Sequence, residues 1–92
     1  MGRAPRMECK GAVYHVIQRG NNREHILQHQ EDKSYLMHWV REYKQEFNFQ
    51  LFGFVLMNNH VHLVIRTLGE PLQMIMHRLC NRFSKYYNAK YD

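Results

Sequence analysis

Two apolar segments separated by only two asparagines constrain the fold of this chain most strongly. The segments "FQLFGFVLM" (residues 49–57) and "HVHLVIRT" (residues 60–67) are rich in the branched and aromatic side chains that favour β-strands. Asn58 and Asn59 between them tolerate positive φ angles and suit a tight two-residue turn. The sequence therefore predicts an antiparallel β-hairpin.

The remaining segments extend this hairpin into an α+β pattern. "GAVYHVIQRG" (residues 11–20), bounded by glycine at both ends, predicts a strand that ends in the polar turn "RGNNRE", and His25–Gln28 suits a short extended return. Apolar spacings of three and four predict helices from Glu31 to Phe47 and from Pro71 to about Tyr87. The expected stripes are Leu36, Val40, Tyr43 and Phe47 in the first helix and Leu72, Met76, Leu79, Phe83 and Tyr86 in the second.

The helix ends and the order of the elements complete the fold prediction. Glu31 and Asp32 suit the first turn of the earlier helix, and Pro71 suits the start of the later one. The order strand, helix, strand, strand, helix predicts an antiparallel sheet with two helices on one face, as in a ferredoxin-like α+β fold. A full version of that fold has at least one more strand.

Length and composition limit the class of protein. A chain of 92 residues has room for a single small core, and no apolar run approaches the ~20 residues of a membrane span. The start has no apolar segment of the secretory kind, and Cys9 and Cys80 fit two reduced thiols, so we expect a cytoplasmic protein. A net charge of +5 mildly favours a polyanionic partner such as nucleic acid.

His60 and His62 are the candidate metal ligands. Strand alternation places them on one face with Val64 and Arg66, while Val61 and its alternate neighbours face the core. Residues two apart on one face lie within ~7 Å, so both imidazoles can bind one divalent ion, with further ligands from elsewhere. Such an ion could polarise a phosphodiester. The alternative is a pair of half-buried, hydrogen-bonded histidines, since seven histidines in 92 residues give about 0.5 such pairs by chance.

Two cationic segments are candidate DNA contacts. One is the polar turn, with Arg19, Asn21, Asn22 and Arg23; the other is a helical ridge of Arg78, Arg82 and Lys85. The ordinary alternatives are a plain polar turn and a solvated helix face. Tyr86 and its neighbours offer tyrosine nucleophiles in principle, but anchoring of the C-terminal helix is the interpretation we favour for Tyr86.

The ordered set "GAVYHVIQRGNNRE", "LFGFVLMNNHVHLVI" and "RFSKYYN" resembles the REP-associated tyrosine transposases, single-tyrosine HUH transposases of bacterial insertion sequences. The resemblance covers residues 3–92 and implies a ferredoxin-like domain that cuts and rejoins single-stranded DNA near hairpins. His60 and His62 match the metal-holding histidines of the HUH motif. The implied cofactor is a divalent metal, usually magnesium or manganese, and the implied intermediate is a phosphotyrosine.

Two departures from the family pattern stand out. Asn58 replaces the usual proline of the turn, and no stretch before Asp92 resembles the segment that carries the family's nucleophilic tyrosine. No catalytic residue is therefore assigned to Tyr86, Tyr87 or Tyr91. We expect residues 1–92 to form one HUH transposase-like domain that is incomplete at its C-terminus, lacking the last strand and the tyrosine helix.

Three hypotheses stay open. The chain is the metal-bearing portion of a DNA-nicking transposase, a catalytically inactive DNA-binding remnant, or a metal-binding or self-associating domain unrelated to DNA. Single-stranded or hairpin DNA is the expected partner of the first two. A homodimer is possible through the open sheet edge in the third.

Overall fold

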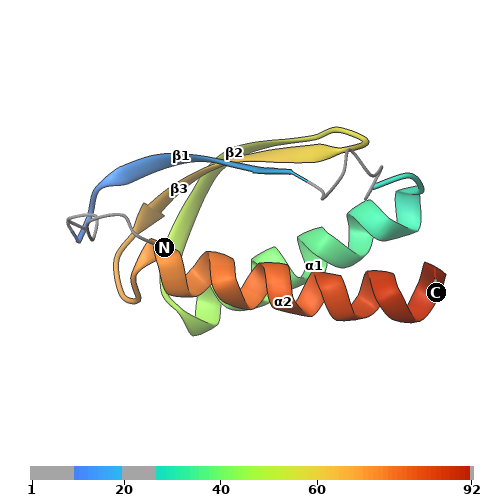
Figure 1. Cartoon of the computed structure of the whole chain (residues 1–92). Coiled ribbons are helices and arrows are strands. Elements are labelled where there is room, and N and C mark those ends of the chain that lie inside the picture. The colour runs from blue at the N-terminus through green and yellow to red at the C-terminus, as the bar shows by residue number, and fades with distance from the viewer. Residues whose placement is uncertain (1–9, 20–26, 92) are drawn as a thin grey trace, which may run out of the picture.

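The computed structural model describes residues 10–19 and 27–91 of the chain (Figure 1). The five elements are β1 (Val13–Arg19), α1 (Gln30–Glu46), β2 (Phe49–Leu56), β3 (His60–Thr67) and α2 (Leu72–Tyr91). The predicted order is confirmed. The predicted polar turn lies outside the described residues, and only Leu27 and Gln28 of the expected extended return are described.

The strands form one antiparallel sheet in the order β1-β3-β2. Val61 of the central strand lies opposite Gln18 of β1 and opposite Leu56 of β2. A β-bulge between Leu51 and Gly53 shifts the register of β2. Three antiparallel strands and two helices in this order make an α+β fold with the strand arrangement of a ferredoxin-like sheet, as predicted.

Both helices lie on the same face of the sheet and run antiparallel to each other (Figure 1). The predicted inward side chains of β3, Val61, Leu63 and Ile65, are buried against them. The remaining buried apolar residues are Leu27, Met37, Val40, Tyr43, Phe47, Phe49, Leu72, Ile75 and Leu79. No helix in the described ranges is long and apolar enough to cross a membrane.

The helices differ from their predicted stripes in detail. Met37 is buried while Leu36 is only partly buried, and Ile75 is buried while Met76 is only partly buried. In each helix one buried position differs by one residue from the prediction, while Val40, Tyr43, Phe47, Leu72 and Leu79 are buried as predicted. Helix α2 also continues to Tyr91, beyond the predicted end at Tyr87, because its last turn bonds to Asp32 of α1.

The connection between α1 and β2 is hydrogen-bonded to the connection between β3 and α2. Asn48 adopts a left-handed backbone with a φ of 56°, which asparagine tolerates, and its carbonyl accepts a hydrogen bond from the N–H of Leu68 at 3.1 Å. The N–H of Glu70 bonds to the carbonyl of Phe47 at 3.2 Å. Between them, Gly69 leaves no room for a side chain: a Cβ there would lie 2.8 Å from the carbonyl oxygen of Phe47.

Candidate functional site

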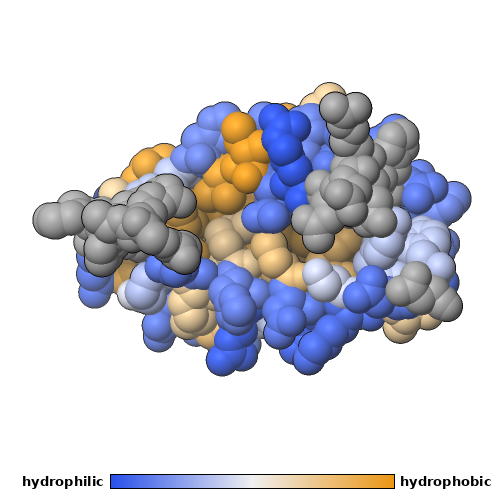
Figure 2. Space-filling view, viewed as in Figure 1, coloured by the Kyte–Doolittle hydropathy of each residue, from blue (hydrophilic) through white to orange (hydrophobic). Residues whose placement is uncertain are grey.

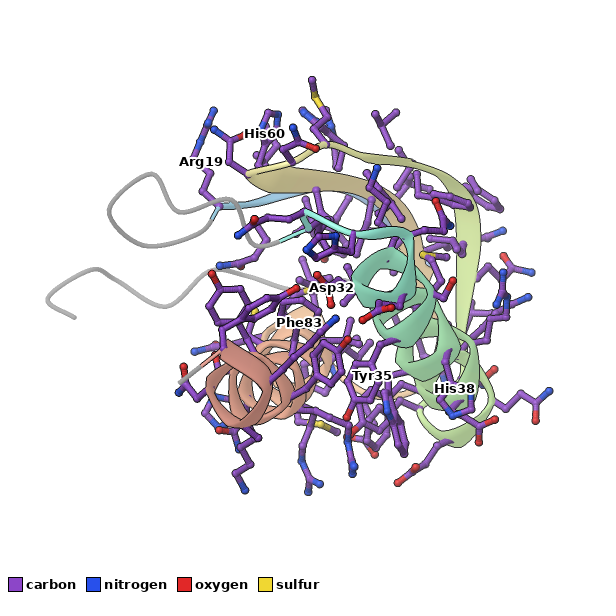
Figure 3. All side chains as sticks on the ribbon, turned by 90° about the vertical axis from the view of Figure 1, so that its right-hand side faces the viewer. Arg19, Asp32, Tyr35, His38, His60 and Phe83 are labelled. Carbon is purple, nitrogen blue, oxygen red and sulfur yellow. The ribbon has the colours of Figure 1, made fainter. Side chains whose placement is uncertain are left out.

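The candidate site lies on the outer face of the sheet, which we define as the face opposite the helices. His60 and His62 are both half-buried there, and their ring centroids are 4.9 Å apart. Figure 3 shows His60 and Arg19 on the side of the sheet away from the two helices. The prediction that the two imidazoles share the face that the core does not use is confirmed.

Each of these imidazoles has a hydrogen-bond partner at Nδ1. His60 Nδ1 lies 2.8 Å from Oδ1 of Asn59, the last residue of the tight turn. An amide oxygen only accepts, so Nδ1 of His60 carries a proton, and in the neutral ring Nε2 then has the free lone pair. His62 Nδ1 lies 3.1 Å from Nε2 of His15 on β1.

His15 is the residue that the sequence interpretation missed. It lies on the outer face because it pairs with Val64, and the ring centroids of His15 and His62 are 5.3 Å apart. Its position in the predicted strand places it on the same face as Ile17 and Arg19. Strand alternation in the sequence could therefore have placed His15 on this face. It could not place His15 beside His62, because that requires the pairing of β1 with β3.

The surroundings of His62 favour a neutral ring. Its direct neighbours on the outer face are Ile17 of β1 and Val55 of β2, both about half exposed. Partial burial lowers the pKa of His62, and the charges of His60, His15 and Arg19 lower it further. A neutral imidazole is the form that binds a metal ion.

The donor set fits a divalent ion only in part. Two imidazoles in their neutral form would supply two nitrogen ligands, and an open site of this kind leaves positions for water or phosphate oxygens. Among the described residues, no group of three or more His, Cys, Asp or Glu side chains could hold a metal ion.

The predicted DNA contacts fall into two separate surfaces. Arg19 lies opposite His60 on the outer face, and Arg66 lies further along the same face. Asn21, Asn22 and Arg23 lie outside the described residues. Arg78, Arg82 and Lys85 belong to α2, so the sheet separates them from the two histidines.

Arg82 of that helical ridge is held in place by α1. Its guanidinium carbon lies 3.7 Å from the centroid of the Trp39 ring, and its Nε–H donates to the Tyr43 hydroxyl at 2.9 Å. Arg78 lies more loosely over Phe47, at 5.9 Å. Part of the predicted basic ridge therefore joins the helices to each other.

A second polar cluster, the Asp32 cluster, comprises Asp32, Tyr86, Lys90 and Tyr91 and lies at the other side of the sheet. The Asp32 carboxylate is fully buried and accepts hydrogen bonds from the hydroxyls of Tyr86 at 2.6 Å and Tyr91 at 2.5 Å. Lys90 Nζ donates to it at 2.7 Å and also pairs with Glu31. This arrangement confirms that Tyr86 anchors the C-terminal helix.

The electrostatics of the Asp32 cluster follow from these bonds. Burial alone would raise the pKa of Asp32, but hydrogen bonds from Lys90, Tyr86, Tyr91 and the backbone of His29 lower it to about 2. Burial and the hydrogen bond to Asp32 raise the pKa of Tyr86 and of Tyr91. Both tyrosines are thus held as neutral hydroxyls, the form that is a poor nucleophile.

Fold and site together define a small α+β domain with a pair of outward-facing histidines on the central strand, on a sheet face that none of the described helices covers. The chain matches, over residues 8–92, the family described as "Transposase IS200 like", and it belongs to that family. The comparison with curated proteins gave no match. The resemblance seen in the sequence is confirmed at this level, and it makes DNA the partner and a transposase the general function.

Proposed function

We propose that this chain is the metal-bearing part of a transposase that nicks and joins single-stranded DNA through a metal-assisted phosphotyrosine intermediate. The observation that supports this proposal most directly is the pair of half-buried imidazoles that share the outer face in a chain of the IS200-like family. Transposases of this family are generally metal-dependent. Within the proposal, residues 1–92 form one HUH transposase-like domain that acts in the cytoplasm.

The chain's own residues have distinct parts in this proposal. His60 and His62 hold a divalent ion, Mg²⁺ or Mn²⁺, and the ion when bound polarises the scissile phosphate. Arg19 lies opposite His60, where its guanidinium can bind a neighbouring phosphate. Arg66 extends this positive surface past His62.

The outer face also suits the bases of a single strand. Ile17 and Val55 lie on either side of His62 with 47% and 54% of their surfaces exposed. Figure 2 shows hydrophobic side chains reaching the molecular surface over β1, next to hydrophilic ones. Apolar side chains that alternate with cations fit unpaired bases and phosphates, which is how single strands are commonly bound. We propose that Asn21, Asn22 and Arg23 extend this contact, while Arg78 and Lys85 form a separate and weaker one.

The test is a cleavage assay with Mn²⁺ and a labelled single-stranded hairpin oligonucleotide. Because no tyrosine of residues 1–92 is assigned as the nucleophile, the assay uses this chain joined to a family segment that carries the nucleophilic tyrosine, and the expected result is shortened strands and a covalent protein–DNA adduct on a denaturing gel. The variants His60→Ala and His62→Ala should abolish both products, because each removes one of the two nitrogen ligands. His77→Ala, which removes an exposed histidine from α2, is the matched control and should cleave normally. Cleavage that survives in the double variant His60→Ala/His62→Ala would contradict the proposal.

A second candidate function is DNA binding without cleavage, as in an inactive remnant. It is favoured by the tyrosines of α2: Tyr86 and Tyr91 donate to the buried Asp32, and their helix packs on the face of the sheet opposite the histidines. In that case no adduct forms even when the chain is joined to the tyrosine segment. Its affinity for single-stranded DNA would still fall with rising salt and would persist in the double variant His60→Ala/His62→Ala. The salt dependence should be weaker in Arg19→Ala than in Lys85→Ala.

A further inference from the structure

The contact between His15 and His62 extends the candidate metal site to a third histidine. We propose that His15 is the positioning residue of this site: it accepts a hydrogen bond from Nδ1–H of His62 and so keeps Nε2 of His62 unprotonated and free to bind an ion. The inference rests on the proposed function for the presence of an ion. It assigns a role to a residue outside the His-x-His pair.

The argument begins with the number of protons on a neutral imidazole. His62 Nδ1 and His15 Nε2 lie 3.1 Å apart, so one hydrogen atom lies between them and one of the rings donates it. If His62 donates, its Nε2 keeps a free lone pair. If His15 donates, the proton of His62 is on Nε2, and that nitrogen cannot bind a cation.

His60 provides the reference for this choice. Its Nδ1 donates to Oδ1 of Asn59 at 2.8 Å, which leaves Nε2 as the ligand atom. Only the arrangement in which His62 is the donor gives both rings a free Nε2. Hydrogen bonds of this type, from the second nitrogen of a ligating histidine to an acceptor, orient the ring and raise its basicity.

Backbone pairing holds His15 in position for this role. His62 pairs directly with Ile17, and His15 is the next residue of β1 on the same face. Diagonal neighbours in an antiparallel pair lie within reach of long and aromatic side chains. The sheet therefore sets the separation of the two rings, while the exposed position of His15 makes it dispensable for the core.

The first measurement is the Mn²⁺ affinity, followed by the loss of the free-ion signal in electron paramagnetic resonance. His15→Phe keeps an aromatic ring but has no acceptor, and it should weaken binding about 10- to 100-fold. His15→Gln supplies an amide oxygen that can accept from His62 and should restore most of the affinity. His77→Phe, at an exposed histidine of α2, should bind as the wild-type chain does. Circular dichroism checks that each variant is folded.

The second measurement needs no metal. Nitrogen-15 chemical shifts of the His62 ring at pH 8 report which nitrogen carries the proton. We expect Nδ1 to be protonated in the wild-type chain and in His15→Gln, and a shift of the proton toward Nε2 in His15→Phe. A merely structural role of His15 would not move this signal.

The outcomes separate this inference from the proposed function. Equal Mn²⁺ affinity of His15→Phe and the wild-type chain, or a proton on Nε2 of His62 in the wild-type chain, would overturn the inference alone. Three ring nitrogens bound to Mn²⁺ in pulsed resonance would also overturn it, since His15 would then be a ligand. Mn²⁺ binding that depends on His15, together with no DNA cleavage by the chain joined to the tyrosine segment, would overturn the nicking function alone. A wild-type chain that binds no Mn²⁺ would overturn both.

Discussion

The two polar clusters of this domain lie on opposite sides of one sheet and differ in how completely their groups are paired. In the Asp32 cluster, a carboxylate with no exposed surface accepts from two tyrosines, a lysine and a backbone N–H. On the outer face, His60 and His62 are half-buried, and each has one side-chain partner at Nδ1. A fully paired, buried group stabilises the fold, whereas a half-buried pair with open nitrogens is available to a ligand.

The aromatic side chains near Asp32 are packed between the two helices, whereas the imidazoles of His60 and His62 lie on the outer face. The ring of Tyr35 in α1 stacks on that of Tyr86 in α2, with the ring centroids 3.9 Å apart. The Asp32 cluster continues this contact toward the C-terminus of α2 through the hydrogen bonds of Tyr86 and Tyr91 to Asp32. The side chains on the outer face have no covering layer among the described residues. Substitutions in the Asp32 cluster should therefore change stability, and substitutions on the outer face should change binding.

The largest effect on stability is expected for Asp32→Asn. The amide lacks the charge that pairs with Lys90 and cannot accept from both tyrosines and the His29 backbone at once, so we expect the free energy of unfolding to fall by about 2–3 kcal/mol. Urea denaturation measures this change. The control is Glu31→Gln, because Glu31 also pairs with Lys90 but its side chain is 69% exposed; it should change stability by less than about 1 kcal/mol. Equal effects of the two variants would remove the distinction between the buried and exposed carboxylates.

The free energy of unfolding should depend on pH in the acid range because of the Asp32 carboxylate. The pKa of Asp32 is lowered from 3.8 to about 2 by folding, so the unfolded chain takes up the proton first as the pH falls. The stabilisation by Asp32, about 2 kcal/mol, is therefore present above about pH 4 and is lost as the pH falls toward 2. Urea denaturation at several pH values should show a shallower acid loss for Asp32→Asn than for the wild-type chain. Parallel curves would contradict this prediction.

A smaller loss of stability is expected for a substitution at Gly69, where the connection between β3 and α2 contacts the connection between α1 and β2. Gly69→Ala would place a Cβ 2.8 Å from the carbonyl oxygen of Phe47, so the backbone must shift, and we expect a loss of about 1–2 kcal/mol. Gly53→Ala is the matched control, because a Cβ there meets nothing within 4 Å; its effect should stay within about 0.5 kcal/mol. Thermal denaturation of both variants measures the difference. A larger loss for Gly53→Ala would contradict the packing that the structure describes.

The smallest effect on stability is expected for the double variant His60→Ala/His62→Ala. Both rings lie on the outer face, and their partners His15 and Asn59 can bond to water once the rings are removed. The melting temperature followed by circular dichroism should match that of the wild-type chain. A loss as large as that of Asp32→Asn would make the two histidines structural residues and would favour the alternative interpretation of the pair.

Much of the local structure follows from residue spacing. Alternation along residues 60–67 correctly assigned Val61, Leu63 and Ile65 to the core and His60 and His62 to the opposite face, because a strand turns successive side chains to opposite sides. The two asparagines after Met57 correctly predicted a two-residue turn, which the N–H of Met57 closes by donating to the carbonyl of His60 at 2.9 Å. Neither asparagine adopts the positive φ angle on which the prediction rested, because Asn48 is the one described non-glycine residue with such an angle. Apolar spacing predicted both helices, although it misplaced one buried residue in each, since several registers of a helix offer a similar stripe.

What the sequence could not reveal depends on contacts between distant residues. Asp32 reads as an ordinary acidic residue in a first helical turn, and only its contacts with residues 54 to 59 positions away bury it. His15 reads as one residue of a strand, and it becomes a partner of His62 only through the pairing of β1 with β3. Arg82 likewise reads as part of an exposed ridge until α1 packs beside it.

The sequence by itself determined the elements, the face of the histidine pair and the transposase family, because these depend on spacings within a few residues and on short ordered motifs. The tertiary structure decided which carboxylate is buried, which histidine joins the pair and which cations share its surface. Burial and long-range hydrogen bonds arise only when segments far apart in the chain pack together. Local sequence patterns do not specify which distant segments come into contact.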